Sequence, residues 1–231
     1  MFQLSIITVV LNDKDGIRKT IESVINQKKI HNNIEYIVID GKSEDGTLDV
    51  IKNYSNHIDY FISEVDYGIY DAMNKGIRLC SGDALLFLNA GDFFVGNVLE
   101  YVEDFPCFLK VKYQNLFGNL IDRPLFKVTS GIPNCHQGII FENKNIYYNT
   151  SYSYCADYDF YIRHGYGSIL KFVHSDGYIL FDHSGISSKR IKERDRESFS
   201  IRRKHFGKLC AINGEVPRFF KRSLRLLLNM L

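Results

Sequence analysis

The chain has 231 residues, enough for one good-sized domain with a short appendage, and its 45% hydrophobic and 24% charged residues are typical of a folded globular protein. Its net charge of +2 is uneven, because residues 189–231 carry 13 Lys and Arg against 4 Asp and Glu, a balance of +9 that leaves −7 for residues 1–188. Five cysteines without a C-x-x-C pair argue against a disulfide framework, and neither a signal peptide nor a membrane-spanning stretch is expected, so the composition favours a protein of the reducing cytoplasm.

Predicted strands and helices alternate through the first half of the chain. Strands buried on both faces are expected at 4–10, 35–40 and 84–88, and a short strand is expected at 59–63. Helices are expected at 15–27, 46–54 and 69–76, the last closed by Gly76. This alternation predicts an α/β fold with a mostly parallel central sheet and helices on both faces.

The second half is less regular. Short strands are expected at 108–117, 125–128, 139–141, 172–173 and 178–181, with a helix at 155–164. Near Ser187 the sequence becomes strongly charged, so we expect the compact domain to span 1–188, in two halves of 1–105 and 106–188, with a basic helical tail at 189–231.

Polar side chains follow each of the four predicted strands of the first half. They are Thr8 and Asn12, Asp40 and Ser43, Glu64 and Asp66, and Asn89 and Asp92. Ligands of open α/β sheets bind beyond the carboxyl ends of the strands, so these four loops are expected to share one crevice. The alternative is that each residue only caps a helix or turn.

Several motifs resemble family 2 glycosyltransferases, and within them the colanic-acid type of bacterial exopolysaccharide assembly. The resemblance covers residues 3–190 and rests on SIITVVLN, TIESVINQ, EYIVIDGKSEDGT, SEVDYGIYDAMNKG, LLFLNAGD, HQGIIF, ADYDFYIR and FDHSGISS. It implies a GT-A fold, a nucleoside-diphosphate sugar as donor, and inversion at the anomeric carbon.

The resemblance also implies donor-binding residues in the first half. A carboxylate at a strand end can accept a hydrogen bond from a uracil N–H or a ribose hydroxyl, and a glycine permits close backbone approach. The implied residues are Thr8, Val10 and Asp40 for the base and ribose, Asp66 and Gly68 near the donor, and Asn74 and Lys75 for the sugar or diphosphate.

A divalent cation, Mn²⁺ or Mg²⁺, is a further implication. Where most of the family carries D-x-D-D, this chain reads Asn89-Ala90-Gly91-Asp92, so Asp92 is the expected metal ligand. Diphosphate oxygens and water would complete the octahedron, and affinity for the metal without substrate is expected to be weak. The alternative is that Asp92 caps a helix at 93–99.

The catalytic base is expected in the segment Ala156-Asp157-Tyr158-Asp159, where Asp157 matches the family's base. Asp159 would point away from it and support the site by orienting Arg163 at i+4. Alternatively, both acids only favour a helix N-terminus.

His136 and Gln137 are expected to bind the acceptor or buttress the base. A nucleophilic pair of Cys135 with His136 is disfavoured, because adjacent residues of an extended segment point in opposite directions. His183, in the loop with Ser187 and Ser188, is a candidate for contacts to the diphosphate or the metal, against a purely structural role.

The end of the tail, residues 215–231, is amphipathic. Apolar residues fall on one helical stripe and Arg and Lys fall opposite, which is typical of a helix lying on a membrane surface. Such a helix would place the protein peripherally on the inner face of the membrane, near a lipid-linked acceptor. Packing on the domain and an oligomer contact are the alternatives, and the acidic body argues against nucleic acid.

The expected function is transfer of a sugar from a nucleotide sugar to a hydroxyl of a saccharide acceptor in surface polysaccharide synthesis. The resemblance implies UDP as the nucleotide, with GDP and dTDP as alternatives. A catalytically silent sugar- or nucleotide-binding partner is one alternative. A dinucleotide-dependent oxidoreductase is another, but it requires G-x-G-x-x-G after the first strand, where this chain has VLNDKDG.

Overall fold

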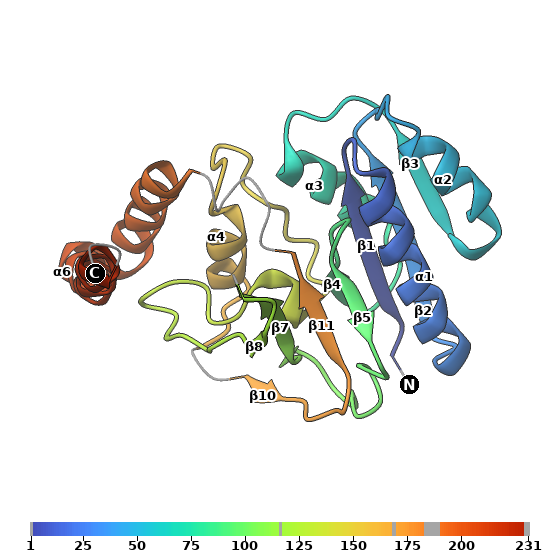
Figure 1. Cartoon of the computed structure of the whole chain (residues 1–231). Helices are drawn as coiled ribbons and strands as arrows, with labels where there is room; N and C mark the ends of the chain where they lie inside the picture. Colours follow the sequence, from blue (N-terminus) through green and yellow to red (C-terminus); the bar gives the residue numbers. More distant parts are fainter. Residues whose placement is uncertain (1, 116, 168–169, 183–189, 229–231) are drawn as a thin grey trace.

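The computed structural model describes residues 2–115, 117–167, 170–182 and 190–228, with side chains described up to residue 212. A seven-stranded sheet forms its centre, in the order β10-β6-β9-β4-β1-β2-β3 (Figure 1). Its strands are β1 Leu4–Val10, β2 Ile34–Asp40, β3 Tyr60–Ser63, β4 Ala84–Phe87, β6 Cys107–Phe108, β9 Ile139–Glu142 and β10 Lys171–Phe172. A second sheet, in the order β5-β11-β7-β8, comprises β5 Phe93–Val95, β7 Val111–Gln114, β8 Leu120–Asp122 and β11 Tyr178–Phe181.

The first four strands of the central sheet are parallel, as the sequence predicts. β1 pairs in parallel with β2 and β4, and β2 pairs in parallel with β3. β9 is antiparallel to both β4 and β6, so it extends the sheet beyond the parallel part. Because β1 and β2 are buried along their whole length, they read as continuous apolar runs rather than alternating ones.

Helices cover both faces of the central sheet. The helices are α1 Lys14–Ile30, α2 Thr47–Asn53, α3 Ile69–Leu79 and α4 Ala156–Arg163, with two single 3₁₀ turns, η1 Ser55–His57 and η2 His136–Gly138. Ile17 of α1 and Val50 of α2 belong to the apolar core on one face, together with residues of the second sheet. Met73 of α3 and Phe160 of α4 belong to the core on the other face. The predicted α/β architecture is therefore confirmed.

One predicted helix end and two predicted strands are wrong. α3 does not end at Gly76 but continues to Leu79, and Gly76 lies inside the helix, where a Cβ would come within 2.4 Å of the Ile7 side chain. The segment 125–128 is not a strand, and the expected strand at 108–117 is interrupted at Leu109–Lys110, where the chain passes from one sheet to the other.

The C-terminal tail is helical, as expected. α6 spans Ile191–Leu228 and is interrupted at Gly207, whose φ of 83° and ψ of 169° are not helical. The part before Gly207 packs against the domain through buried side chains that include Ile201 and Arg202.

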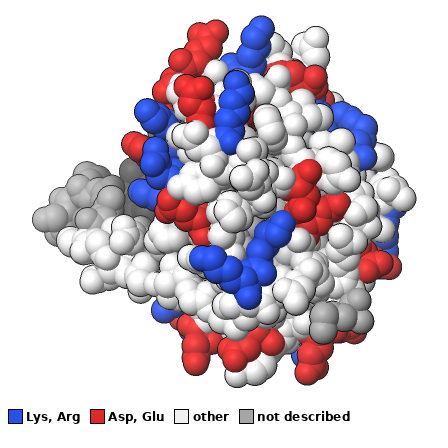
Figure 2. Space-filling view, turned by 90° about the vertical axis from the view of Figure 1, so that its right-hand side faces the viewer, with Lys and Arg blue, Asp and Glu red and all other residues white. Residues whose placement is uncertain are grey.

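Charges of both signs are interspersed on the face that carries α1 and α2, so that face forms no large patch of one sign (Figure 2). Within the residues that the structure describes, no helix is both long and apolar enough to span a bilayer.

Candidate functional site

The loops that follow β1 to β4 lie together at one edge of the sheet, as the sequence predicts. Gly41 N donates to Val10 O at 2.9 Å, Glu64 N to Asp40 O at 3.0 Å and Ala90 N to Val9 O at 3.1 Å. Parallel pairing aligns the carboxyl ends of these strands, and the crossing backbone bonds fix their loops against one another.

Asp40 and Thr8 are at this edge, but the structure buries both side chains completely. The Asp40 carboxylate accepts hydrogen bonds from Ser43 Oγ and Ser63 Oγ, each at 2.5 Å, and from Ser43 N. Thr8 Oγ1 donates to Leu88 O at 2.7 Å and accepts from Tyr36 OH at 3.2 Å. In this arrangement Asp40 organises the loops after β2 and β3, and Thr8 belongs to the core.

Asp66 and Lys75 form an ion pair that ties the loop after β3 to α3. Lys75 Nζ lies 2.6 Å from Asp66 Oδ1 and 2.9 Å from Glu64 Oε1, and it donates to Val65 O at 2.9 Å. Gly68 immediately precedes α3 and has a φ of 110°, a conformation that L-residues with side chains rarely adopt. No protein atom lies within 4 Å of a Cβ added there.

Asn74 joins the two halves of the molecule. Its Nδ2 donates to Tyr148 O at 3.0 Å, and its Oδ1 accepts from Tyr148 N at 2.7 Å. The side chain is buried and its amide is engaged at both ends, so it acts as a structural link between α3 and the chain before α4.

Asp92 is a buried acid, 3% exposed, at the start of β5. Its Oδ1 accepts from Asp182 N at 2.8 Å and its Oδ2 from Gln137 Nε2 at 3.0 Å. Burial raises the pKa of the Asp92 carboxyl to about 8, against the smaller opposing effect of these hydrogen bonds. Because a strand follows it, the alternative of a helix cap at 93–99 is wrong.

These contacts do not fit a metal site prepared by the protein. Both oxygens of Asp92 are engaged and burial disfavours its charged form, whereas a hard cation prefers ionised oxygen ligands. Among the described residues, no group of three His, Cys, Asp or Glu could hold a metal ion. Asp92 as a metal ligand stays a prediction that this arrangement does not favour.

The turn η2 brings the two halves of the candidate site together. His136 Nδ1 lies 3.6 Å from Asp157 Oδ2, and the neighbouring Gln137 holds Asp92. His136 Nε2 also lies 3.4 Å from Asn89 Nδ2, in the loop after β4. Asp92 and Asp157, expected to share one site, are therefore bridged by two consecutive residues.

Asp159 lies on the other side of α4 from this turn. Its fully buried carboxylate accepts from Arg163 Nε at 2.6 Å and faces His205 Nε2 at 2.8 Å. The pKa of Asp159 is lowered, because these hydrogen bonds and the charges of Arg163 and Lys204 outweigh its burial, the largest single effect. The expected contact with Arg163 is confirmed, and the second contact attaches α4 to α6.

Two buried tyrosines were not anticipated from the sequence. The rings of Tyr70 and Tyr148 stack with centroids 5.3 Å apart, and Tyr148 stacks on Phe160 of α4 at 4.1 Å. Burial, and then the charge of Asp157, raise the pKa of both phenols, so both are neutral neighbours of the acid. In the sequence they look like ordinary apolar core positions, and no local signal sets them apart.

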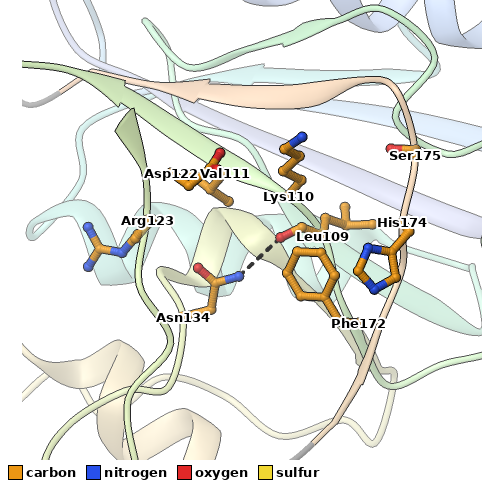
Figure 3. A pocket seen from close by; sticks show the side chains of 9 residues that line it. All are labelled: Leu109, Lys110, Val111, Asp122, Arg123, Asn134, Phe172, His174 and Ser175. Atoms are coloured by element: carbon orange, nitrogen blue, oxygen red, sulfur yellow. Dashed lines mark hydrogen bonds between the residues drawn. The ribbon is translucent and has the colours of Figure 1, made fainter. Parts of the chain in front are cut away.

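A cavity of about 300 Å³ lies where the two sheets meet (Figure 3). It is lined by Leu109, Lys110, Val111, Asp122, Arg123, Asn134, Phe172, His174 and Ser175. None of the sequence-predicted site residues lines it. Asn134 Nδ2 donates to Leu109 O at 3.2 Å and lies shortly before η2 in the chain, so the cavity adjoins this turn. His183, Ser187 and Ser188 lie outside the described residues.

The comparison with known proteins identifies the family. The family model described as "Glycosyl transferase family 2" matches residues 5–105. A PGL/p-HBAD biosynthesis glycosyltransferase of Mycobacterium bovis is 30% identical over 183 residues, which cover 69% of this chain and 68% of that protein. The chain belongs to glycosyltransferase family 2. The narrower resemblance to the colanic-acid type stays a prediction.

A second relative matches over a shorter stretch of the chain. An uncharacterized glycosyltransferase of Mycobacterium tuberculosis is 44% identical over 93 residues, 40% of this chain, and the match spans only 35% of that relative.

Solved structures show the same GT-A fold. The mannosyltransferase PcManGT from Pyrobaculum calidifontis, solved with GDP-Man and Mn²⁺, gives a TM-score of 0.65 at 12% identity over all of this chain and 81% of that one. S. aureus TarS 1–349 with UDP-GlcNAc gives 0.58 at 15% identity over 86% of this chain and 66% of that one.

Proposed function

We propose that this family 2 glycosyltransferase is an inverting enzyme that moves a sugar from a nucleoside-diphosphate sugar, with UDP as the nucleotide, to a hydroxyl of a saccharide acceptor. The observation that carries the proposal is the pair of contacts made by η2. His136 lies 3.6 Å from Asp157, and Gln137 holds Asp92 beside the loop after β4. The candidate base Asp157 and the loops after β1 to β4 therefore both adjoin η2.

Asp157 is the proposed base. As the acceptor oxygen forms its bond to the anomeric carbon, the bond from that carbon to the diphosphate oxygen breaks and its electron pair leaves with the diphosphate. The proton of the acceptor hydroxyl passes to Asp157. The partly exposed Asp157 side chain, 20% accessible, suits contact with an incoming acceptor, and His136 is placed to hold its carboxylate in position.

The donor is proposed to bind over the loops after β1 to β4. Asp40 and Asp66 support this surface from below through Ser43, Ser63 and Lys75. The proton transfer to Asp157 needs no cation bound to Asp92. Any contribution from Mn²⁺ or Mg²⁺ would depend on oxygens of the diphosphate and water.

The acceptor is proposed to be lipid-linked, with the chain after Gly207 lying on an anionic membrane surface. Residues 208–231 contain Arg218, Lys221, Arg222 and Arg225 among Phe and Leu residues. Each Lys or Arg near an anionic surface contributes about 1 kcal/mol of binding. The part before Gly207 packs on α4 and is not available for that surface, so the proposed catalytic unit extends from 1–188 into α6.

Replacing Asp157 with Asn tests the proposal. UDP binding should be retained, because Asp157 lies on the acceptor side, and transfer should fall by roughly two to four decades, the usual contribution of a general base. The measurement is UDP release with a nucleotide sugar and a saccharide acceptor, beside UDP affinity by calorimetry with and without Mn²⁺. Undiminished turnover in the variant would refute the role of Asp157.

A second candidate function is a nucleotide-sugar-binding partner without turnover. It is favoured by the sequence Asn89-Ala90-Gly91-Asp92, which leaves a single, fully engaged carboxylate after β4. UDP binding without UDP release, over a panel of donors and acceptors, would select it.

A further inference from the structure

The segment before α4 is held by one side chain of α6. Glu197 Oε1 accepts from Ser153 N at 2.8 Å, and Glu197 Oε2 accepts from Tyr154 N at 2.8 Å and from Cys155 N at 3.0 Å. Three consecutive backbone N–H groups thus end on a single carboxylate, more than 40 residues away in the sequence. Hydrogen bonds to an ionised acceptor are shorter and stronger than neutral ones, so this carboxylate fixes the path by which the chain enters α4.

Asp157 follows this segment directly. Cys155 is the residue before α4, and Asp157 is the second residue of the helix. Within the described part of the chain, the Asp157 side chain has no hydrogen bond or ion pair with α6. It reaches the opposite way, to His136 at 3.6 Å. The direction of Asp157 is therefore set by where α4 begins, and Glu197 determines that point.

A second contact fixes the roll of α4 about its own axis. His205 Nε2 lies 2.8 Å from Asp159 Oδ1, while Arg163 binds Oδ2 at 2.6 Å. Glu197 and His205 are eight positions apart on α6, about two helical turns. Glu197 holds the chain at the start of α4, and His205 holds the face of α4 that carries Asp159. These two contacts fix the position and rotation of α4, and therefore the direction of the Asp157 side chain on its opposite face.

We propose that Glu197 is a positioning residue for the reaction: it holds the start of α4 so that Asp157 meets the acceptor hydroxyl. The inference rests on the proposed role of Asp157 as the base. Glu197 touches neither donor nor acceptor, and acts only through the backbone of residues 153–155. A misplacement of a base by about 1 Å is enough to cost roughly a hundredfold in rate.

The test compares Glu197→Ala, Glu197→Gln and the control Glu193→Ala in the full chain. Glu193 lies one turn earlier on α6, and its ion-pair partner among the described residues is Arg190, at 3.4 Å on the surface. At a temperature where melting curves show all variants folded, Glu197→Ala should lower kcat roughly ten- to a hundredfold and leave KM for the donor unchanged. Glu197→Gln, which keeps one acceptor oxygen, should recover part of kcat, and Glu193→Ala should match the wild type.

A double-mutant cycle separates positioning from stability. Combined with Asp157→Asn, Glu197→Ala should cause no further loss of kcat, because there is no base left to place, while its effect on the melting temperature should persist. An unchanged kcat in folded Glu197→Ala, or an equal loss in both backgrounds, would overturn the positioning role. If Asp157→Asn itself turns over normally, the proposed base is refuted, and that result is independent of Glu197.

Discussion

At the scale of single residues, Asp92 shows how burial changes the chemistry of an acid. An Asp at the end of a strand looks in the sequence like a charged ligand. Here its carboxyl has lost nearly all contact with water, and two N–H donors only partly compensate, so its pKa rises to about 8. Asp92 therefore acts as a structural link between Gln137 and the backbone at Asp182 rather than as a charged ligand.

The raised pKa gives a prediction for stability against pH. Between the ordinary carboxyl pKa of about 4 and the folded value of about 8, the folded protein binds one more proton than the unfolded chain. The stabilisation from this group is complete below that window and is lost as pH rises through it. Asp92→Asn should remove this contribution, because the amide does not titrate.

The measurement is the free energy of unfolding in urea for wild type and Asp92→Asn, at several values from about pH 5 to about pH 8. Titrations of all other groups are common to both proteins and cancel in the difference. The wild type should lose stability relative to the variant as pH rises. Two parallel curves would show that Asp92 is ionised throughout.

For single residues, the sequence predicts which side chains lie close together more accurately than it predicts how deeply each one is buried. Asp157 and His136 are 21 positions apart, and their meeting at 3.6 Å follows from their place in motifs of a known family. The burial of Asp40 and Thr8 depends on neighbours such as Ser63 and Tyr36, which no local pattern identifies.

At the scale of elements, the strands of the first half follow directly from their composition. β1 and β2 are uninterrupted runs of mostly β-branched residues, buried on both faces, and both were predictable to within a residue. β6 and β10 have two residues each, too few for any periodic signal, and their pairing is with segments 30 or more positions away. The short strands of the second half were therefore predicted only in outline.

The prediction that Gly76 ends α3 is also wrong because of a contact with a segment distant in sequence. A glycine near the end of a helical pattern usually closes the helix, but here it makes room for β1. A Cβ at this position would meet Ile7 Cγ2 at 2.4 Å, a distance that real Cβ contacts do not show. Close contact between α3 and the sheet, rather than a helix end, explains the glycine.

Gly76→Ala should therefore destabilise the protein, although alanine is the better helix former by about 1 kcal/mol. Overpacking a filled core costs about 1–3 kcal/mol, so the clash with Ile7 should dominate. Chemical denaturation gives the difference. The control is Gly167→Ala, where nothing lies within 4 Å of an added Cβ and the expected change is below about 0.5 kcal/mol. A more stable Gly76→Ala protein would contradict this packing.

At the scale of the whole molecule, the tail divides into two parts at Gly207. Up to Phe206, α6 is packed against α4 and contributes fully buried side chains such as Ile201 and Arg202. The sequence marks the whole of 189–231 as one charged segment, because charge density alone does not reveal which charges find buried partners. Arg202 Nη1, which donates to Ser198 Oγ at 2.8 Å, is such a case.

Two truncations test this division. Ending the chain after Ile212 should leave the melting temperature unchanged and abolish sedimentation with vesicles of anionic phospholipid, since the basic amphipathic segment is removed. Ending it after Arg190 should prevent folding, because it exposes the α4 core. If the chain that ends at Ile212 bound vesicles as well as the full chain does at the same salt concentration, the membrane contact would lie elsewhere.

The break at Gly207 bears on the proposed membrane contact. Its φ of 83° with a ψ of 169° belongs to a region that is essentially closed to every residue with a side chain. The corner between the two lengths of α6 is thus built from one residue's backbone. If the segment after Gly207 lies flat on lipid, the backbone angle at Gly207 sets how the rest of the domain is oriented above the membrane. That orientation would determine whether a lipid-linked acceptor can reach Asp157.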